Sequence, residues 1–576
     1  MLRLNKINCE VTAVTERTDI MKKLISVLLC VATMLSCTAF SLTSIAAEAI
    51  GTTYYVDSVD GDDSNSGKSE SQAWKTLAKA SAQVYEAGDV LRFKAGGIYS
   101  GTFTAQGNGT AENPITVSSY GDIDAEGKPL IYNRGEHTIT FYIHNVNGWT
   151  VENLEFTAPD AKGLNVYADN NFGIMKDIKI DNCTFHNIWD HETEAYGSNH
   201  AAIFICSTGK YTHLENVSVT NVNIYNCAYG INMHGNTLEW SRDIFISPEE
   251  SYNQNILIEG TSLYNVYYDA IIIGSVNNLI VRDCSLIKTS LNTDHYTAPM
   301  WSHHAKNYLI ENCEIAGAEN YKDGMAVDFD GWTTDSTYQY IYSHDNIRFI
   351  NNCVYDHQTR NTNCTVRYCL SVNDNKGDNS FANVLGTPAY DYTIENDKAQ
   401  YMDNLKFYNN TLINCSSFNL KDVRNCYIAN NIFYGKDSDT QFITKKVSVN
   451  DDTGKKYLRA FTGTITNNCF YNCAIPSLAK NSVNVIPEFI GTDLDDKNSF
   501  MLAEGSKLIG KGIQVEEDMG EQDFYGNPLT DTHNIGCYEG NGEKTENEIS
   551  FWAKIGNFFK NIIAFIRQII FDIDNL

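Results

Sequence analysis

One short pattern of apolar and polar residues recurs through the middle of the chain. Two apolar residues, adjacent or one residue apart, are followed by Asn or Asp and then by Cys or another small or apolar residue. Clear copies lie at residues 178–183, 280–284, 309–313, 349–353 and 465–469. Weaker copies end at Leu154, Val222, Thr261, Cys369, Thr411 and Ile432. Alternation with a period of two predicts short strands, and the Asn and Asp residues predict the turns that end them.

The copies recur at short, irregular intervals, which is typical of a solenoid with variable insertions. In a solenoid, like positions of successive coils stack on one another, so columns of Val, Ile, Cys and Asn form. A propeller needs a more uniform period, and a sandwich has no reason to stack Asn-Cys pairs. We therefore predict an all-β right-handed parallel β-helix for residues 50–540.

The 16 cysteines of the chain largely follow this pattern. Several take the small apolar position that ends a copy, where a compact and stackable side chain is suitable. The pattern predicts buried structural thiols, and disulfides are the alternative for an exported chain. No CxxC pair supports a zinc site.

Charge and composition narrow the classes of partner. The 43 Lys and Arg residues face 71 Asp and Glu residues, so the net charge is −28 and a nucleic-acid partner is not expected. A hydrophobic content of 43% and an aromatic content of 12% argue against a disordered acidic chain.

The two ends differ from the middle. Residues 1–20 are interpreted as an upstream extension. Residues 21–49 are interpreted as a secretory signal with a Met-Lys-Lys start, an apolar run and small residues at Ser44, Ala46, Ala47 and Ala49. The signal predicts a secreted or extracellular protein, and an uncleaved membrane anchor is the alternative. Residues 541–550 read as a polar linker, and residues 551–576 as an amphipathic helix. That helix is suited to cell-surface or membrane-surface contact, or to docking on the main domain or on itself.

Several segments carry a family resemblance. The opening and closing segments of the predicted domain resemble the corresponding segments of secreted right-handed β-helix proteins of the pectate-lyase-like superfamily. The opening segments are residues 54–57, 61–67, 74–77 and 88–99, and the closing segment is 523–539. The resemblance implies a first strand at 53–57, an N-terminal capping helix within 72–86 and a first coil at 89–100. The superfamily contains polysaccharide lyases, glycoside hydrolases, esterases and non-catalytic proteins, so the reaction must come from the site.

A second strand follows the Asn-ended strand in each central coil. We align residues 201–207, 230–236, 270–276, 298–304 and 324–330. The second and fourth positions are apolar and are expected to point inward: Ile231, Ile271, Met325, Phe204, Met233, Ile273, Trp301 and Val327. The fifth and seventh positions are expected to point outward: Ile205, His234, Gly274, Ser302, Asp328, Ser207, Asn236, Val276, His304 and Asp330. The residues just before these strands are His200, Tyr229, Asp269, Thr297 and Asp323.

Carboxylates and imidazoles therefore gather on one outward face. Paired carboxylates cleave glycosidic bonds, one as acid and the other as base or nucleophile. We assign these roles to Asp323 and Asp328, with Asp269 and Asp330 as alternates. Aspartates beside solenoid strands also cap turns, which is the structural alternative for each of them.

Substrate-binding groups are expected around the carboxylates. They are His234, His304, His200, Tyr229 and Trp332. Insertions at 186–200, 237–255, 289–297 and 331–346 are expected to overhang the face and to supply Trp189, Trp240, Trp332, Tyr338 and Tyr342. Aromatic faces stack on sugar rings, so a polysaccharide is the expected substrate.

Hydrolysis by carboxylates requires no cofactor, but one loop offers a calcium site. Asp57, Asp60, Asp62 and Asp63 crowd a short segment, although Asx-turns explain them equally well. A calcium-dependent lyase is one alternative function, with Lys322 or Lys306 as its base. A non-catalytic glycan-binding or adhesion protein is the other.

Overall fold

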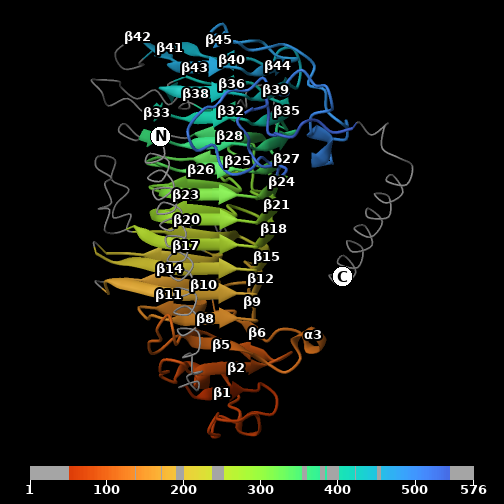
Figure 1. Ribbon diagram of the computed structural model, residues 1–576. Helices are drawn as coiled ribbons and strands as arrows, with labels where there is room; N and C mark the ends of the chain where they lie inside the picture. The colour runs from red at the N-terminus through yellow and green to blue at the C-terminus, as the bar shows by residue number, and fades with distance from the viewer. Residues whose placement is uncertain are drawn as a thin grey trace, which may run out of the picture. The chain divides into compact units, whose positions relative to one another are not determined.

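Three long parallel sheets form the protein. The computed structural model describes residues 51–135, 138–169, 172–189, 200–209, 211–235, 252–352, 360–376, 383–385, 401–421, 423–449 and 456–544. The segments predicted as upstream extension, signal and C-terminal helix, and most of the linker, lie outside these residues. Successive strands visit the three sheets in turn, so that each coil lies on the preceding one (Figure 1). This is the right-handed parallel β-helix that the repeat predicts.

Sheet 1 has 15 strands. They are β1 (Thr53–Val56), β2 (Val90–Lys94), β5 (Ile115–Tyr120), β8 (Trp149–Glu152), β11 (Ile174–Asp181), β14 (His213–Thr220), β17 (Asn253–Glu259), β20 (Val276–Arg282), β23 (Lys306–Glu311), β26 (Thr337–Gln339), β30 (Thr365–Arg367), β34 (Lys406–Tyr408), β38 (Cys426–Ala429), β43 (Gly463–Thr466) and β45 (Ala479–Lys480).

Sheet 2 has 9 strands and carries the candidate site. They are β4 (Phe103–Thr104), β7 (Ile139–His144), β10 (Lys162–Ala168), β13 (Ala201–Ser207), β16 (Tyr229–His234), β19 (Ile271–Gly274), β22 (Met300–His303), β25 (Met325–Phe329) and β28 (Arg348–Asn352).

Sheet 3 has 13 strands. They are β3 (Ile98–Ser100), β6 (Leu130–Tyr132), β9 (Glu155–Ala158), β12 (Thr184–Ile188), β15 (Asn223–Cys227), β18 (Ser262–Val266), β21 (Ser285–Thr289), β24 (Glu314–Ala316), β27 (Tyr342–His344), β31 (Leu370–Val372), β35 (Thr411–Cys415), β39 (Ile432–Gly435) and β44 (Cys469–Tyr471).

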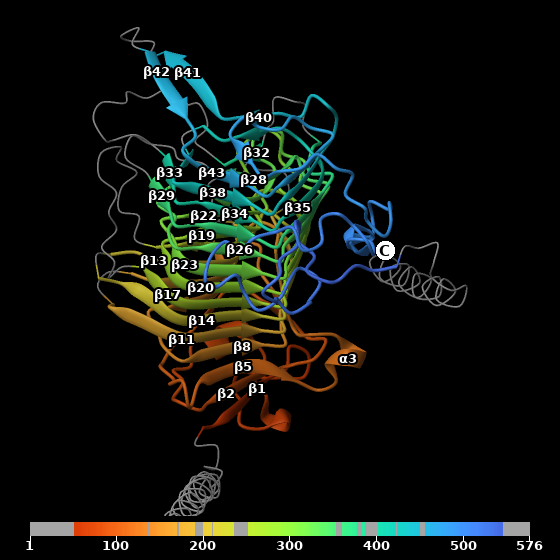
Figure 2. The same ribbon diagram turned by 45° about the horizontal axis from the view of Figure 1, so that its top comes forward.

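Smaller sheets accompany the later coils. Two are parallel: β29 (Arg360–Thr362), β33 (Tyr401–Asp403) and β37 (Val423–Arg424), and β32 (Asn383–Val384), β36 (Phe418–Asn419) and β40 (Phe442–Ile443). The antiparallel pair β41 (Lys445–Val449) and β42 (Lys456–Ala460) projects from the stack (Figure 2).

Helices are few and short among the described residues. They are η1 (Glu70–Gln72), α2 (Leu77–Ser81), α3 (Ile123–Glu126) and η3 (Lys497–Phe500). The predicted capping segment 72–86 thus contains one helix of 5 residues, which begins where the Thr76 side chain accepts a hydrogen bond from the Lys79 amide. In the part of the chain that is described, no helix has the length and apolar character needed to cross a membrane.

The turn between sheets 1 and 3 explains the recurring Asn. At this turn one residue per coil has a left-handed backbone, with φ of 59° at Asn153, 47° at Asn182 and 53° at Asn312. Asn tolerates this conformation better than most residues do. The next residue points into the core, and this column contains Cys183, Cys284 and Cys313, as the pattern predicts.

Some copies of the pattern are placed differently. Residues 349–352 belong to β28 of sheet 2, so the copy ending at Cys353 is not part of this column, and Cys353 itself lies outside the described residues. In the last coils the column is filled by Asn410, Asn431 and Asn468, one residue earlier than predicted. Their side chains form a buried ladder, with Nδ2–Oδ1 distances of 3.0 Å at both steps.

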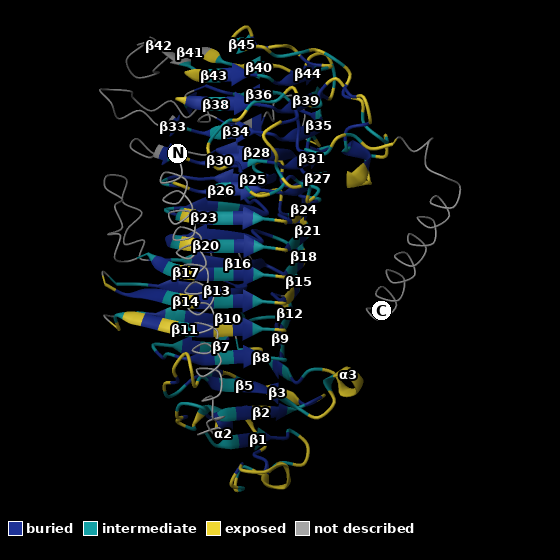
Figure 3. Cartoon of the chain, in the orientation of Figure 1, coloured by how far each residue is buried: buried dark blue, intermediate teal, exposed yellow. Residues whose placement is uncertain are grey.

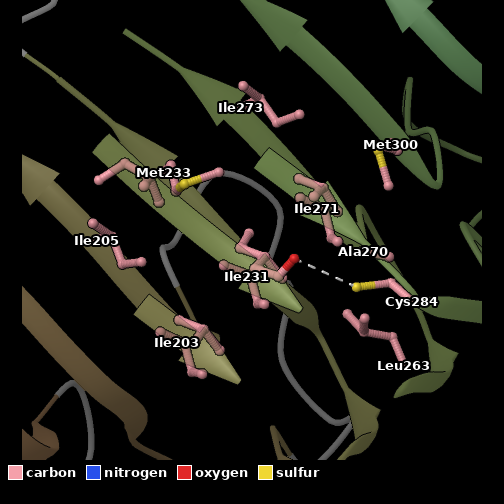
Figure 4. Close-up of a cluster of buried hydrophobic side chains, with 14 of the residues drawn as sticks. Ile203, Ile205, Ile231, Met233, Leu263, Ala270, Ile271, Ile273, Cys284 and Met300 are labelled. Atoms are coloured by element: carbon pink, nitrogen blue, oxygen red, sulfur yellow. Dashed lines mark hydrogen bonds between the residues drawn. The ribbon is translucent and has the colours of Figure 1, made fainter. Parts of the chain in front are cut away.

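The described cysteines are buried free thiols, as predicted. They are Cys183, Cys206, Cys227, Cys284, Cys313, Cys364, Cys369, Cys415, Cys426, Cys469, Cys473 and Cys537. Cys284 lies among the aliphatic side chains of the core (Figure 4). Burial raises the pKa of the Cys183 thiol to about 12, so it stays protonated at neutral pH and is a poor nucleophile.

Residues after β45 pack on the outside of the last coils. Ile535 and Tyr538 share one apolar cluster with Ile432, and Met519 shares another with Tyr408. Buried residues follow the inner surface of all three sheets, and exposed residues concentrate at the turns and in this closing segment (Figure 3).

Candidate active site

Sheet 2 presents a continuous inner row and two outer columns of side chains. The inner row is aliphatic: Leu164, Ile203, Ile231, Ile271, Met300 and Val327. Figure 4 shows Ile203, Ile231, Ile271 and Met300 of this row. The first outer column is Tyr142, Asn165, Phe204, Asn232, Ile272, Trp301, Asp328 and Asn351. The second outer column is His144, Tyr167, Cys206, His234, Gly274 and His303. Gly274 lies next to His234 because the preceding residues, Ile273 and Met233, are paired.

The predicted alignment of these strands is wrong by one residue in β13 and β22, and by two residues in β25, where Val327 and not Met325 follows Met300 in the inner row. Phe204 and Trp301, expected inside, lie on the outer face, and Ile205 and Ser302, expected outside, point into the interior. Because strand side chains alternate, a slip of one residue exchanges the two faces. Ser207 and Val276 are also interior residues, and Asn236 lies outside the described residues. His234, Gly274 and Asp328 do occupy the outer face.

Asp269 lies two residues before β19 and is 5% exposed. One carboxylate oxygen, Oδ1, accepts hydrogen bonds from the Ala298 amide at 2.8 Å and from Trp301 Nε1 at 2.9 Å. Burial raises the pKa of Asp269 to about 7, these two donors oppose the shift, and the charge of Asp323 adds to it. Asp269 and Asp323 therefore interact electrostatically, and Asp269 takes up a proton near neutral pH.

Asp323 precedes β25 at a sharp bend and is half-buried. Gly324 has a φ of +47°, and an added Cβ would lie 2.2 Å from the Asn320 carbonyl oxygen, so glycine suits this bend. Burial raises the pKa of Asp323 to about 6, against the attraction of Arg348. A half-buried carboxyl group with such a pKa can still donate a proton to a ligand. Arg348 was not among the expected residues, because residues 349–353 were interpreted as an Asn-ended strand, whereas Arg348 begins β28 of sheet 2.

Asp328 and Asp330 lie near the other end of β25. Asp328 is 4% exposed and stands in the outer column between Trp301 and Asn351, whose Nδ2 lies 3.4 Å from Asp328 Oδ2. Asp330 is 3% exposed, and its Oδ1 accepts a hydrogen bond from the Gly331 amide at 2.7 Å. Asp328 is thus directed to the outer face, and Asp330 also supports the turn that follows the strand.

Imidazole and indole rings occupy neighbouring positions on the same face. The ring centroids of His234 and His303 are 5.6 Å apart, those of His303 and Trp301 5.3 Å, and those of His304 and Trp332 6.4 Å. Burial lowers the pKa of His234 to about 4, so it is neutral at neutral pH. His303 was not among the expected residues, because the alignment of β22 was wrong by one residue and placed His303 on the inner face. Its pKa is also lowered, by burial and by the two neighbouring histidines.

An apolar cluster packs on this face around Phe204 of the first outer column. It contains Tyr229, Tyr268, Trp189 and Phe204, and the rings of Tyr229 and Tyr268 stack with centroids 4.9 Å apart. His200 is 7% exposed, just before β13.

The expected overhanging segment at 331–346 is instead a regular coil. Tyr338 belongs to β26 and Tyr342 to β27, and both side chains are buried, so neither contributes to the face. Trp240, expected from another insertion, lies outside the described residues.

The acidic loop near the N-terminus is built from turns and an ion pair. Asp57 is 2.6 Å from Lys94 Nζ, with Asp60 3.7 Å from the same atom. Asp62 accepts hydrogen bonds from Ser64, and Asp63 from the amides of residues 75 and 76. Within the described ranges, no group of three or more His, Cys, Asp or Glu side chains converges to hold a metal ion. In the structure these four aspartates support turns and an ion pair, which is the alternative considered above for them.

Comparison with known proteins yields distant relatives. No family model matches the chain. It is 24% identical over 423 residues to lacto-N-biosidase of Bifidobacterium longum subsp. longum, and the match covers 57% of this chain and 26% of the relative. The chain thus spans about a quarter of the length of this curated relative.

Two solved structures are also similar. One is GH136 lacto-N-biosidase from Eubacterium ramulus, with a TM-score of 0.47, 20% identity, and coverage of 68% of this chain and 67% of the other. The other is XylC in complex with xylose, with a TM-score of 0.44, 12% identity, and coverage of 86% and 99%.

Proposed function

We propose that this chain is a glycoside hydrolase that cleaves a glycosidic bond in a polysaccharide or oligosaccharide on the outer face of sheet 2. The observation that carries the proposal is that Trp301 donates a hydrogen bond to the buried Asp269 and neighbours the buried Asp328, while the charge of the half-buried Asp323 acts on Asp269. Asp269 and Asp323 have pKa values raised to about 7 and about 6 by burial, and Asp328 is the neighbour of Trp301 on the next coil. The distant relationship to a lacto-N-biosidase supports the same reaction class.

Each carboxyl group has a distinct role in this mechanism. Asp323 is the acid, because it is half-buried, is protonated below about pH 6 and can reach a ligand. Asp328 is the partner carboxylate that activates water or attacks the sugar, and Asp330 is its alternate on the same face. Asp269 positions Trp301 through the indole N–H, and it loses its own proton only near pH 7. His234, which is neutral, and His304 contact the sugar, together with Trp332, Tyr229 and His200.

A polysaccharide panel with product analysis tests the assignment. Wild-type protein should release products with new reducing ends, and kcat/KM should fall above about pH 6 as Asp323 ionises. Asp323→Asn and Asp328→Asn should each lose activity at least about a hundredfold while the urea midpoint stays at or above that of the wild type. Full activity in both variants would remove the site assignment.

Other products would indicate another reaction. Products that absorb in the ultraviolet indicate elimination by a lyase, and binding without any product indicates a glycan-binding protein. Either result contradicts hydrolysis.

We also propose that the protein is exported, on the basis of the signal-like segment 21–49, and that residues 551–576 contact a cell or membrane surface. The N-terminal sequence of the protein recovered from culture medium tests export. Partition of full-length and 1–550 chains between medium and cell surface tests the C-terminal contact.

A further inference from the structure

A network of buried hydroxyl groups lies inside the coil, directly behind β25. It consists of Ser302, Tyr308, Thr333 and Tyr338, each at most 2% exposed, and is called the hydroxyl network below. Ser302 Oγ is 2.9 Å from Tyr308 Oη and 3.0 Å from Thr333 Oγ1. Tyr308 Oη in turn donates a hydrogen bond to Tyr338 Oη at 3.2 Å. These hydroxyl groups come from sheet 2, from sheet 1 and from the segment between β25 and β26, so only the folded coil brings them together.

The two tyrosines of the network occupy core positions that are aliphatic in neighbouring coils. Tyr338 takes the position that Ile310 has in the preceding coil and Val366 in the following one. Tyr308 likewise follows Leu279. A hydroxyl group in an apolar core costs free energy unless it forms hydrogen bonds, so the groups that these hydroxyls bind decide what the network does.

The hydroxyl network ends on the backbone that carries two candidate carboxyl groups. Tyr338 Oη donates to the carbonyl oxygen of Asp328 at 3.0 Å, and Thr333 Oγ1 donates to that of Asp330 at 2.7 Å. The carbonyl oxygen of the residue between them accepts a hydrogen bond from Nδ2 of the buried Asn361 at 2.7 Å. Consecutive carbonyl oxygens at the end of β25 are therefore each held by a buried side chain.

This strand end is a place where a small displacement affects the reaction. Regular pairing with β22 stops one residue after Asp328, and Asp330 lies just beyond β25. Retaining glycoside hydrolases need carboxyl groups about 5 Å apart and inverting ones about 6.5–9.5 Å apart. A misplacement of about 1 Å lowers the rate about a hundredfold, so the backbone that carries these groups has to be held firmly.

We propose that the hydroxyl network positions the carboxyl groups of Asp328 and Asp330 by holding the end of β25. Its members are positioning residues, because they are buried in the coil and act through the backbone. The inference rests on the proposed function for the role of the two carboxyl groups, whereas the restraint on β25 is measurable without any reaction.

Four variants of the full chain test the network. Tyr338→Phe and Thr333→Val each remove one donor to a carbonyl oxygen and nearly keep the size of the side chain. Thr333→Ser keeps the hydroxyl group and is the rescue variant. The matched control is Tyr85→Phe, because the buried Tyr85 hydroxyl also donates to a single carbonyl oxygen, that of Ala80 at 2.8 Å, at the N-terminal end of the stack.

Hydrogen exchange followed by mass spectrometry measures the restraint. In Tyr338→Phe and Thr333→Val, the amides of residues 326–332 should exchange roughly three- to tenfold faster than in the wild type. The Tyr85→Phe control should leave the exchange of these amides unchanged, although it loses a comparable buried hydrogen bond.

Steady-state kinetics on the glycan that is hydrolysed in the polysaccharide panel measure the consequence. In Tyr338→Phe and Thr333→Val, kcat should fall roughly ten- to a hundredfold, with KM within about twofold of the wild type. Thr333→Ser should recover most of the kcat that Thr333→Val loses, and Tyr85→Phe should keep the wild-type kcat. A merely structural role would lower stability in all three hydroxyl-deleted variants without this difference in kcat.

The proposal is overturned if Tyr338→Phe and Thr333→Val exchange these amides no faster than the wild type, if both keep the wild-type kcat, or if Tyr85→Phe lowers kcat as much as they do. Failure of the proposed function gives a different result. If Asp328→Asn and Asp330→Asn both keep full activity while exchange still separates the network variants from the control, the restraint on β25 is supported and only the catalytic assignment is removed.

Discussion

The replacement Asp269→Asn should make the protein more stable at high pH. Asp269 is almost fully buried, and burial raises its pKa from 3.8 to about 7. Above that pH the folded protein has to hold a buried carboxylate. Asn keeps a carbonyl oxygen that can accept the hydrogen bonds from the Ala298 amide and Trp301 Nε1, and it carries no charge.

The size and sign of the effect follow from the shift in pKa. A folded-state pKa that is raised by about three units corresponds to about 4 kcal/mol. The folded state binds the proton more tightly than the unfolded chain does, so the stabilising effect of protonation is complete below about pH 4 and is lost as the pH rises to about 7. Wild-type protein should therefore lose up to about 4 kcal/mol across this window relative to Asp269→Asn.

Urea unfolding of both proteins from about pH 4 to about pH 8 measures the difference. Asp181→Asn is a control of opposite sign. Burial acts to raise the pKa of Asp181, but hydrogen bonds from Thr220 and Asn221 outweigh it and leave the pKa lowered. That control should lose stability relative to the wild type above about pH 4, with no further change between about pH 4 and pH 7. Parallel curves for wild type and Asp269→Asn would refute the argument that Asp269 is a buried acid with a raised pKa.

Three further outcomes are expected. Asn431→Ala should lower the free energy of unfolding by about 3–5 kcal/mol, because the Asn431 side chain forms hydrogen bonds with Asn410, Asn468 and two carbonyl oxygens in the core. In the same urea measurement, the control Asn182→Gly in the exposed part of the turn column should cost less than about 1 kcal/mol. Equal losses in the two variants contradict a stabilising role of the Asn ladder. Trp301→Phe should shift the pH midpoint of the Asp269 stability difference upward by about one unit, because the donor that favours the ionised carboxylate is lost, and an unmoved midpoint speaks against that bond. Lys94→Met should destabilise the protein by about 1–2 kcal/mol at neutral pH, because Asp57 loses the ion pair that lowers its pKa. A chelator should leave the urea midpoint of the wild type unchanged. A chelator effect that Asp57→Asn abolishes would show that the loop binds a metal ion.

The sequence by itself determined the fold class and the turn chemistry. Strands of period two and a left-handed turn at Asn182 or Asn312 depend on residues that are close together in the chain, so they can be read without knowledge of the rest. The buried cysteines Cys183, Cys284 and Cys313 follow from the same local pattern, because the residue after this turn points into the coil.

Only the tertiary structure decided which side chains share the candidate site. The length of each turn sets the register of the next strand, and a slip of one residue exchanges inner and outer faces. For this reason Trp301 was expected inside and His303 was not foreseen. Arg348 was missed because residues 349–353 were interpreted as an Asn-ended strand and not as a strand of sheet 2. The raised pKa values of Asp269 and Asp323 likewise depend on burial by coils that are distant in sequence, and no local pattern of residues contains that information.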